Sequence, residues 1–322
     1  MILVTGGTGL LGSYLLRELA AREQKVIALY RKEIPKNIDS PQIQWINGDI
    51  LDVVLLEEIM EQVDFVYHCA ATVSFNPRKN DELKKVNIEG TANVVNASLK
   101  SGVQKLVHVS SVSALGVKHD GSLISENSAW EQDRHSSFYS RSKYFAELEV
   151  WRGMAEGLKS VIVNPSLILG AGNWENGSSA LFKKAWEEFP WYTEGGGGMV
   201  DAGDVARVMI LLMESEITNE RFIINAENRS FKELFTRAAE RFGKRPPHKK
   251  ASRFMTGLLW RIEKIRTWVT GSEPLLTRTA AEAAGRRVYY DNTKLLKFLP
   301  GFQYKPLNQT IDECCNQYMQ MQ

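Results

Sequence analysis

The chain begins with MILVTGGTGLLGSYLL (residues 1–16), in which Gly6, Gly9 and Gly12 recur at every third position. The apolar first residues predict a short buried strand, and the pattern from residue 10 onward predicts a helix. Glycines at such a junction permit a tight turn and a close approach of a pyrophosphate to the helix N-terminus. The alternative is a merely structural turn, which the position at a strand-to-helix junction disfavours. We predict that a dinucleotide is bound by Gly6, Thr8, Gly9, Leu10, Leu11 and Gly12.

Outward from this junction, the first half of the chain alternates short apolar runs with longer helical patterns. The predicted strands are residues 1–5, 25–30, 43–48, 63–68, 105–111 and 160–166, and the predicted helices lie near 10–22, 52–62, 79–101 and 137–157. Nearly continuous hydrophobic strands are typical of a parallel sheet that is covered by helices on both faces. The sequence therefore predicts an α/β fold with a Rossmann-type doubly wound parallel sheet.

The alternation stops after residue 165, where a second, smaller region of mixed α/β character begins. Regular patterning returns in VDAGDVARVMILLME (200–214), in which Asp204 is a candidate helix cap, and in the strand-like RFIIN (221–225). We assign residues 1–165 to a dinucleotide-binding domain, to which the chain returns with residues 200–225. Residues 166–199 and 226–322 are assigned to a substrate-binding domain. Further helices are predicted at 230–243, 251–270, 275–284 and 307–320, and TEGGGGMVD (193–201) is interpreted as a mobile flap.

The composition of the chain is that of a soluble globular protein. Its 322 residues are 43% hydrophobic and 24% charged, and no apolar run approaches the roughly 18 residues of a membrane span. The first residues show no secretory signal, so we expect a cytoplasmic protein.

The three cysteines have no zinc or disulfide spacing, and we predict no metal site. Residues 241–322 hold 15 basic against 6 acidic residues but no nucleic-acid motif, so we expect no nucleic-acid partner.

The residues after the second predicted strand bear on the choice between NAD and NADP. An acidic residue there would bind the ribose 2′-hydroxyl of NAD, but the chain has Tyr30, Arg31 and Lys32 instead. A guanidinium matches the geometry of a phosphate, so Arg31, with Lys32 adding charge, favours NADP(H). NAD(H) stays open, because Arg31 could also be an exposed loop charge or stack on the adenine.

The stretch FYSRSKYFAE (138–147) places Tyr139 four residues before Lys143 in a predicted helix. Residues at this spacing are neighbours on a helix surface. A nearby ammonium favours the ionised phenol and would make the tyrosine a better proton shuttle near pH 7. On the pair alone, an ordinary amphipathic helix is the competing interpretation.

The motifs follow one another in a fixed order along the chain. They are the glycine pattern at 6–12, GDILD (48–52), HCAATVSF (68–75), VNIEGTANVVNAS (86–98), VSSVSALG (109–116) and YSRSK (139–143). Together they resemble the extended short-chain dehydrogenase/reductase family. The resemblance covers nearly the whole chain, because NPSLILGAG (164–172) and VDAGDVARVM (200–209) also match the family's later landmarks.

The resemblance implies a catalytic trio of Ser111, Tyr139 and Lys143. Ser111 precedes Gly116 by five residues, as in the family's serine pattern, so we choose it over Ser110. Tyr139 would pass a proton to or from the substrate oxygen, and Ser111 would hydrogen-bond that oxygen. Lys143 would lower the pKa of the tyrosine and hold the nicotinamide ribose.

Further cofactor contacts are implied by the same resemblance, at Asp49, Ile50, Ala70, Ala71, Thr72, Asn87 and Pro165. Asp49 would meet the adenine amino group and Ile50 would pack on its ring. Asn87 could equally be a buried structural amide. His68 and His108 lie in apolar strand patterns, and we expect them to be satisfied core histidines.

The sequence IVNPSLILGAG (162–172) resembles the dihydroflavonol, cinnamoyl-CoA and 3β-hydroxysteroid groups more than the nucleotide-sugar enzymes. It implies an oxidoreductase that transfers a hydride between the nicotinamide and a carbonyl or alcohol carbon of a small or medium organic substrate. The substrate pocket is predicted to include Phe75, Asn164, Trp174, Phe182 and Trp186, although these aromatic residues could simply form a small core.

Two other functions stay open at this point. The first is a nucleotide-sugar epimerase or dehydratase with tightly bound NAD, and the second is a non-catalytic dinucleotide sensor. The amphipathic stretch 253–269 permits peripheral membrane contact, but packing against the substrate pocket or a second subunit is the interpretation we favour. A homodimer is compatible with the sequence.

Overall fold

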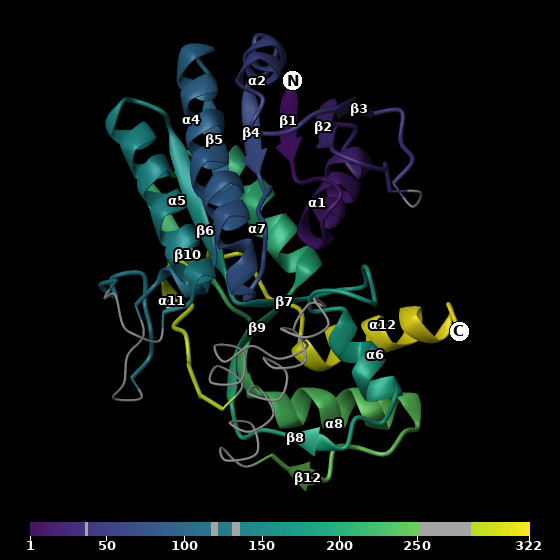
Figure 1. Cartoon of the computed structure of the whole chain (residues 1–322). Helices are drawn as coiled ribbons and strands as arrows, with labels where there is room; N and C mark the ends of the chain where they lie inside the picture. Colours follow the sequence, from purple (N-terminus) through teal and green to yellow (C-terminus); the bar gives the residue numbers. More distant parts are fainter. Residues whose placement is uncertain (36–37, 117–121, 131–135, 252–284) are drawn as a thin grey trace.

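The computed structural model describes residues 1–35, 38–116, 122–130, 136–251 and 285–322. Its centre is a seven-stranded sheet in the order β10-β6-β5-β4-β1-β2-β3, in which every pairing is parallel (Figure 1). The strands are β1 (Ile2–Thr5), β2 (Val26–Tyr30), β3 (Ile43–Asn47), β4 (Phe65–His68), β5 (Lys105–Val109), β6 (Ser160–Pro165) and β10 (Glu220–Ile224). This is the doubly wound parallel sheet that the sequence predicts.

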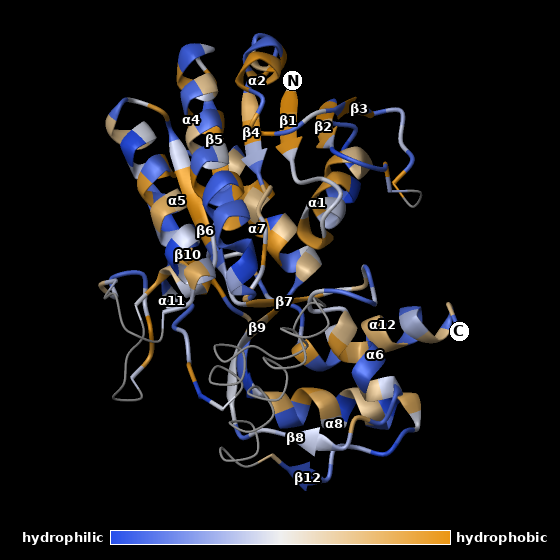
Figure 2. Ribbon diagram, viewed as in Figure 1, coloured by the Kyte–Doolittle hydropathy of each residue, from blue (hydrophilic) through white to orange (hydrophobic). Residues whose placement is uncertain are grey.

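Helices cover both faces of this sheet because successive strand residues point to opposite sides. In β1, Ile2 and Val4 pack with α1 (Leu10–Ala21) and α7 (Ala202–Glu214), whereas Leu3 packs with the helices of the other face. Those helices are α2 (Val53–Met60), α4 (Gly90–Lys100) and α5 (Phe138–Ala155). Figure 2 shows the resulting pattern, with hydrophobic strands inside and polar outer helix faces.

The segment before α4 is less regular than the single helix predicted for residues 79–101. A 3₁₀ turn (Pro77–Lys79) leads into α3 (Asn80–Leu83), and a π-helical segment (Lys84–Glu89) joins α3 to α4. Such π-helical segments are rare and occur frequently at functional sites.

A second lobe lies beyond the carboxyl ends of the parallel strands (Figure 1). It contains a sheet of β7 (Leu167–Leu169), β9 (Gly196–Asp201) and β11 (Glu227–Ser230), with the helices α6 (Ala180–Trp186), α8 (Phe231–Phe242) and α12 (Leu307–Met319). The short strands β8 (Trp191–Tyr192) and β12 (Lys249–Lys250) pair with each other, and α11 (Thr293–Phe298) packs beside β10. A capping box between Ser230 and Glu233 starts α8, and Gly243 at φ 65° ends it.

The glycine run that we interpret from sequence as a mobile flap is instead part of a strand. Residues 196–201 form β9, the central strand of the three-stranded sheet. A Cβ at Gly196 would lie 2.5 Å from the Arg229 carbonyl oxygen, and one at Gly198 would lie 2.3 Å from Asn225 Oδ1. The glycines therefore allow neighbouring groups to approach closely, which is a packing requirement rather than a sign of motion.

The predicted helices 251–270 and 275–284, with the amphipathic stretch 253–269, fall mainly or wholly within 252–284 and so outside the described residues. Among the helices that the structure does describe, none has both the length and the hydrophobicity needed to span a bilayer.

Candidate active site

The turn between β1 and α1, with the start of α1, contains two glycines, Gly6 and Gly12, at which a Cβ would clash with backbone atoms. Gly6 has φ +72°, and a Cβ there would lie 2.6 Å from the Ala70 nitrogen. A Cβ at Gly12 would lie 2.2 Å from the Gly6 carbonyl oxygen. Gly9 is the N-cap of α1, and the first helical bond runs from Ser13 N to Gly9 O. The N–H groups of the first turn therefore have no acceptor within the helix and are suited to an anion.

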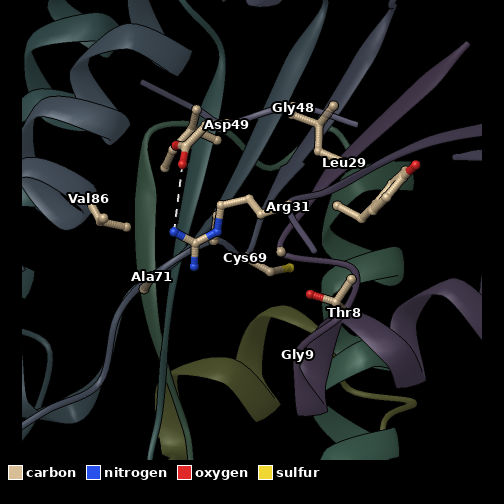
Figure 3. Close-up of a pocket in the computed structure, with 13 residues that line it drawn as sticks. Thr8, Gly9, Leu29, Arg31, Gly48, Asp49, Cys69, Ala71 and Val86 are labelled. Atoms are coloured by element: carbon tan, nitrogen blue, oxygen red, sulfur yellow. Dashed lines mark ion pairs between the residues drawn. The ribbon is translucent and has the colours of Figure 1, made fainter. Parts of the chain in front are cut away.

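A cleft of about 260 Å³ opens beside this turn, at the carboxyl ends of β1, β2 and β4 (Figure 3). It is lined by Gly6, Thr8, Gly9, Leu29, Tyr30, Arg31, Gly48, Asp49, Ile50, Cys69, Ala70, Ala71 and Val86. Eight of these were predicted from sequence as cofactor contacts. The five that sequence reasoning missed are Leu29, Tyr30, Gly48, Cys69 and Val86. Tyr30, Gly48, Cys69 and Val86 are chain neighbours of predicted residues, and Leu29 lies two residues before Arg31. Val86 comes from the π-helical segment.

The remaining predicted cofactor residues are not among the described residues that line this cleft. They are Leu10, Leu11, Gly12, Lys32, Thr72, Asn87, Lys143 and Pro165. Leu11 is buried in the core under the glycine turn, and Pro165 is buried at the end of β6. Lys32 is exposed on the loop after β2.

Arg31 reaches across the cleft toward Asp49 (Figure 3). Its Nη1 lies 3.6 Å from Asp49 Oδ2, and both side chains are partly exposed, at 59% and 37%. The two residues that sequence analysis associates with the adenosine end of a dinucleotide therefore face each other. An exposed ion pair of this length is weak, so either partner can exchange the other for a ligand.

Tyr139 and Lys143 lie in the first turns of α5, which Ser137 caps by accepting a hydrogen bond from Ser140 N. The Tyr139 phenol makes hydrogen bonds with the side chains of Ser111 and Ser113. Ser113 Oγ in turn donates to Ser111 Oγ at 2.9 Å. The structure thus brings Ser111 and Tyr139 together as predicted, and adds Ser113, which the sequence pattern gave no reason to select.

The electrostatics of Tyr139 differ from the expectation that Lys143 lowers its pKa. Burial raises the pKa of the phenol above its usual value, and the hydrogen bonds with Ser111 and Ser113 oppose that rise. The Lys143 ammonium donates instead to the Val109 carbonyl oxygen at 2.8 Å. The phenol is therefore protonated at neutral pH, which is the state that a proton donor needs.

Lys143 is 2% exposed, and this desolvation lowers its pKa to about 8, against the opposing effect of Glu147 and Cys69. Its neighbours include His68 and His108, whose rings are tilted by 33° with centroids 5.1 Å apart. His68 contacts Thr5 Oγ1 and Thr91 Oγ1, as expected of a satisfied core histidine. His108 differs from that expectation, since neither ring nitrogen has a partner among the described residues.

Comparison with known proteins identifies this arrangement. A sequence model of the NAD dependent epimerase/dehydratase family matches residues 2–226. The chain belongs to this family.

Individual relatives agree with that assignment. A putative dihydroflavonol 4-reductase of Synechocystis sp. is 28% identical over 92% of this chain and 88% of its own length. Sterol demethylase protein B of Methylococcus capsulatus is 31% identical over 70% of each chain. The crystal structure of gox2253 superposes with a TM-score of 0.85 at 28% identity, covering 100% of this chain and 98% of the other. The extended short-chain dehydrogenase/reductase branch of the family fits these relatives, and the chain is an NAD(P)-dependent enzyme.

Asn87 has the hydrogen bonds of a buried amide that holds a loop in place. Its Oδ1 accepts from Thr72 N at 2.8 Å, and its Nδ2 donates to the Thr72 carbonyl oxygen and to Ser142 Oγ. These bonds join the loop after β4 to α5. Through these bonds, Asn87 and Thr72 hold that loop in position. The same loop carries Ala70, Ala71 and Phe75.

The predicted substrate residues separate into two groups. Phe75 makes an edge-to-face contact with Tyr139, with ring centroids 5.7 Å apart, and is 43% exposed. Trp174, Phe182 and Trp186 instead pack with α8 and α12 in the core of the second lobe. This packing accounts for the three side chains without a ligand, so we leave them out of the proposed substrate pocket. Asn164 is fully buried, and its Nδ2 donates to Ser111 and Glu147, whereas its Oδ1 has no partner among the described residues.

Proposed function

We propose that the protein is an NADP-preferring reductase of a carbonyl carbon, with Tyr139 as the proton donor. The observation that carries this proposal is the protonated phenol of the partly buried Tyr139, which lies beside the hydroxyl groups of Ser111 and Ser113. The bound NADPH would supply a hydride to the carbonyl carbon. Tyr139 would give its proton to the carbonyl oxygen, so that the product is an alcohol. Ser111 would hydrogen-bond the same oxygen as negative charge develops on it.

The cofactor would lie along the carboxyl edge of the sheet. The glycine turn and the first turn of α1 would hold the pyrophosphate, and the adenosine end would enter the cleft between Arg31 and Asp49. A 2′-phosphate would then compete with Asp49 for the Arg31 guanidinium, which is a better partner for a phosphate than for a distant carboxylate. Lys143 would hold the nicotinamide ribose.

The loop that packs on Tyr139 carries exposed apolar side chains. Phe75 packs on the tyrosine ring, and Val73 in the same loop is 66% exposed. The named activities of the relatives, a dihydroflavonol reductase and a sterol demethylase component, support a small or medium carbonyl compound with apolar rings. Exposed apolar side chains beside a proton donor are suited to such a substrate.

The cofactor part of the proposal is tested by titrating the stripped protein with NADPH and NADH. We expect NADPH to bind more tightly, and Arg31→Ala to weaken NADPH much more than NADH. Lys25→Ala is the matched control, because this exposed lysine lies just before β2, at the opposite end of that strand from the cleft. Equal losses for both cofactors in Arg31→Ala would contradict the phosphate role.

A further inference from the structure

Glu147 is a buried carboxylate to which the proposed mechanism assigns no role. It is 1% exposed and lies in α5, one helical turn after Lys143 and two turns after Tyr139. The spacing puts all three residues on one face of the helix. Because burying a charged group is costly unless it is paired, the partners of Glu147 indicate its role.

One carboxylate oxygen of Glu147 is connected to the main chain of Ser111. Asn164 Nδ2, at the end of β6, donates both to Glu147 Oε1 and to the Ser111 carbonyl oxygen, the latter at 3.0 Å. Asn164 has no exposed surface. Glu147 therefore fixes the amide that holds Ser111 in place beside Tyr139.

The other carboxylate oxygen is connected to the edge of the sheet. Arg221 in β10 donates from Nη1 to Glu147 Oε2 at 3.2 Å and from Nε to the Glu126 carbonyl oxygen at 2.9 Å. Glu126 Oε1 accepts from Ile223 N. Both Glu147 oxygens thus have buried or partly buried partners, so the side chain has one defined position.

Glu147 also acts on Lys143 through its charge. The groups that face Lys143 are Glu147 on α5, Cys69 and His68 at the end of β4, and His108 on β5. The two histidines are neutral at pH 7 because burial lowers the pKa of each. Burial also raises the pKa of the Cys69 thiol to about 12. Glu147 is the carboxylate among these groups, and it opposes the loss of the lysine charge that burial causes.

We propose that Glu147 is a positioning residue for the proposed reduction, which keeps Lys143 in its charged form and, through Asn164, holds Ser111 against Tyr139. This proposal rests on the proposed function. A purely stabilising ion pair is the competing explanation, but buried ion pairs commonly add little to stability compared with apolar residues.

The test is the pH dependence of NADPH binding, measured by fluorescence titration of Glu147→Gln. In the wild-type protein, affinity should fall as the pH rises through about 8, when Lys143 loses its proton. In Glu147→Gln this fall should occur at a pH lower by on the order of one unit. At about pH 6, where the lysine is charged in both proteins, the affinities should agree within about twofold.

The matched control is Glu149→Gln, the same change on the same helix at a carboxylate paired with Arg152. Its binding curve should overlay that of the wild-type protein. Glu147→Asp keeps the charge, so its curve should also stay in place, although its shorter reach should lower kcat by roughly tenfold through Ser111. If Glu147→Gln does not fold, Glu147→Gln combined with Arg221→Gln removes both charges of the pair and should show the same shift.

The outcomes separate the two proposals. If the wild-type protein binds NADPH and reduces carbonyls but the Glu147→Gln curve overlays it, the positioning role is wrong and the proposed function stands. If the wild-type protein binds no nicotinamide cofactor, both are wrong.

Discussion

The surroundings of Tyr139 keep its phenol in the protonated form that the proposed reduction uses. Burial keeps the phenol protonated, while the hydroxyl groups of Ser111 and Ser113 and the ring of Phe75 hold it in place. A protonated phenol can donate to a carbonyl oxygen at once, whereas alcohol oxidation first requires its ionisation. The residue-scale geometry therefore suits the proton-donation step of the proposed reduction.

Replacement of Tyr139 by Phe removes the proton donor and leaves the ring that packs on Phe75. We expect turnover of a carbonyl substrate to fall by about 10²-fold or more, which is the usual contribution of a positioned acid. NADPH affinity should change little, since the phenol lies outside the cleft lining. Steady-state kinetics together with a binding titration check this, and full activity in the variant would refute the assignment of the proton donor.

We expect the charge of Lys143 to set the pH dependence of the reaction. The pKa of the buried lysine is lowered to about 8, so its charge is present below that pH and is lost above it. The value of kcat/KM for reduction, which reports the free enzyme, should be constant near pH 7 and fall as the pH rises through about 8. A profile that stays flat to pH 10 would contradict a role for the lysine charge.

At the scale of elements, we expect two glycines at the junction of β1 and α1 to have different roles, one in cofactor binding and the other in the stability of the fold. A Cβ at Gly9 would meet only the Gly6 carbonyl oxygen, at 3.3 Å, whereas a Cβ at Gly12 would approach that atom to 2.2 Å. We expect Gly9→Ala to keep the fold but weaken cofactor binding, because the methyl group would project beside the pyrophosphate site. Gly12→Ala should destabilise the protein by about 1–3 kcal/mol. Thermal unfolding and NADPH titration of both variants check this, and equal stability losses would argue against it.

The strand β9 allows a similar comparison within one glycine run. Gly196→Ala would push a methyl group to 2.5 Å from the rigid Arg229 carbonyl oxygen and should cost about 1–3 kcal/mol of unfolding free energy. Gly197→Ala is the control, because its nearest neighbour would be the Val288 oxygen at 3.3 Å. Chemical denaturation should rank the first variant clearly below the second. The reverse order would contradict the packing role of Gly196.

For the whole molecule, the sequence contains enough local information to predict the main sheet and most of the cleft. The apolar strand runs and the glycine triplet depend on local patterning, and both lie where the sequence placed them. Other features depend on contacts between distant segments. They are the strand character of Gly196–Asp201, the π-helical segment that presents Val86, and the link from Glu147 through Asn164 to Ser111. Single-sequence patterns carry no record of such contacts. For the same reason, the aromatic residues of the second lobe could not be divided in advance between core and pocket.

A ligand that binds only the folded state stabilises the whole molecule. At a concentration about 100 times its Kd, NADPH should add roughly 2.7 kcal/mol to the unfolding free energy and raise the Tm. NADH at the same concentration should give a smaller shift. This is measured by differential scanning fluorimetry, with Arg31→Ala as the control, in which the difference between the two cofactors should disappear.

The most direct test of the reductase proposal is the oxidation of NADPH by the purified wild-type protein in the presence of a panel of aldehydes and ring-containing ketones. We predict that at least one carbonyl compound consumes NADPH stoichiometrically with alcohol formation, and that NADH supports a slower reaction. The account would be contradicted if the protein carried tightly bound NAD from purification, reduced none of the carbonyls, and interconverted a UDP- or dTDP-sugar with no net consumption of cofactor.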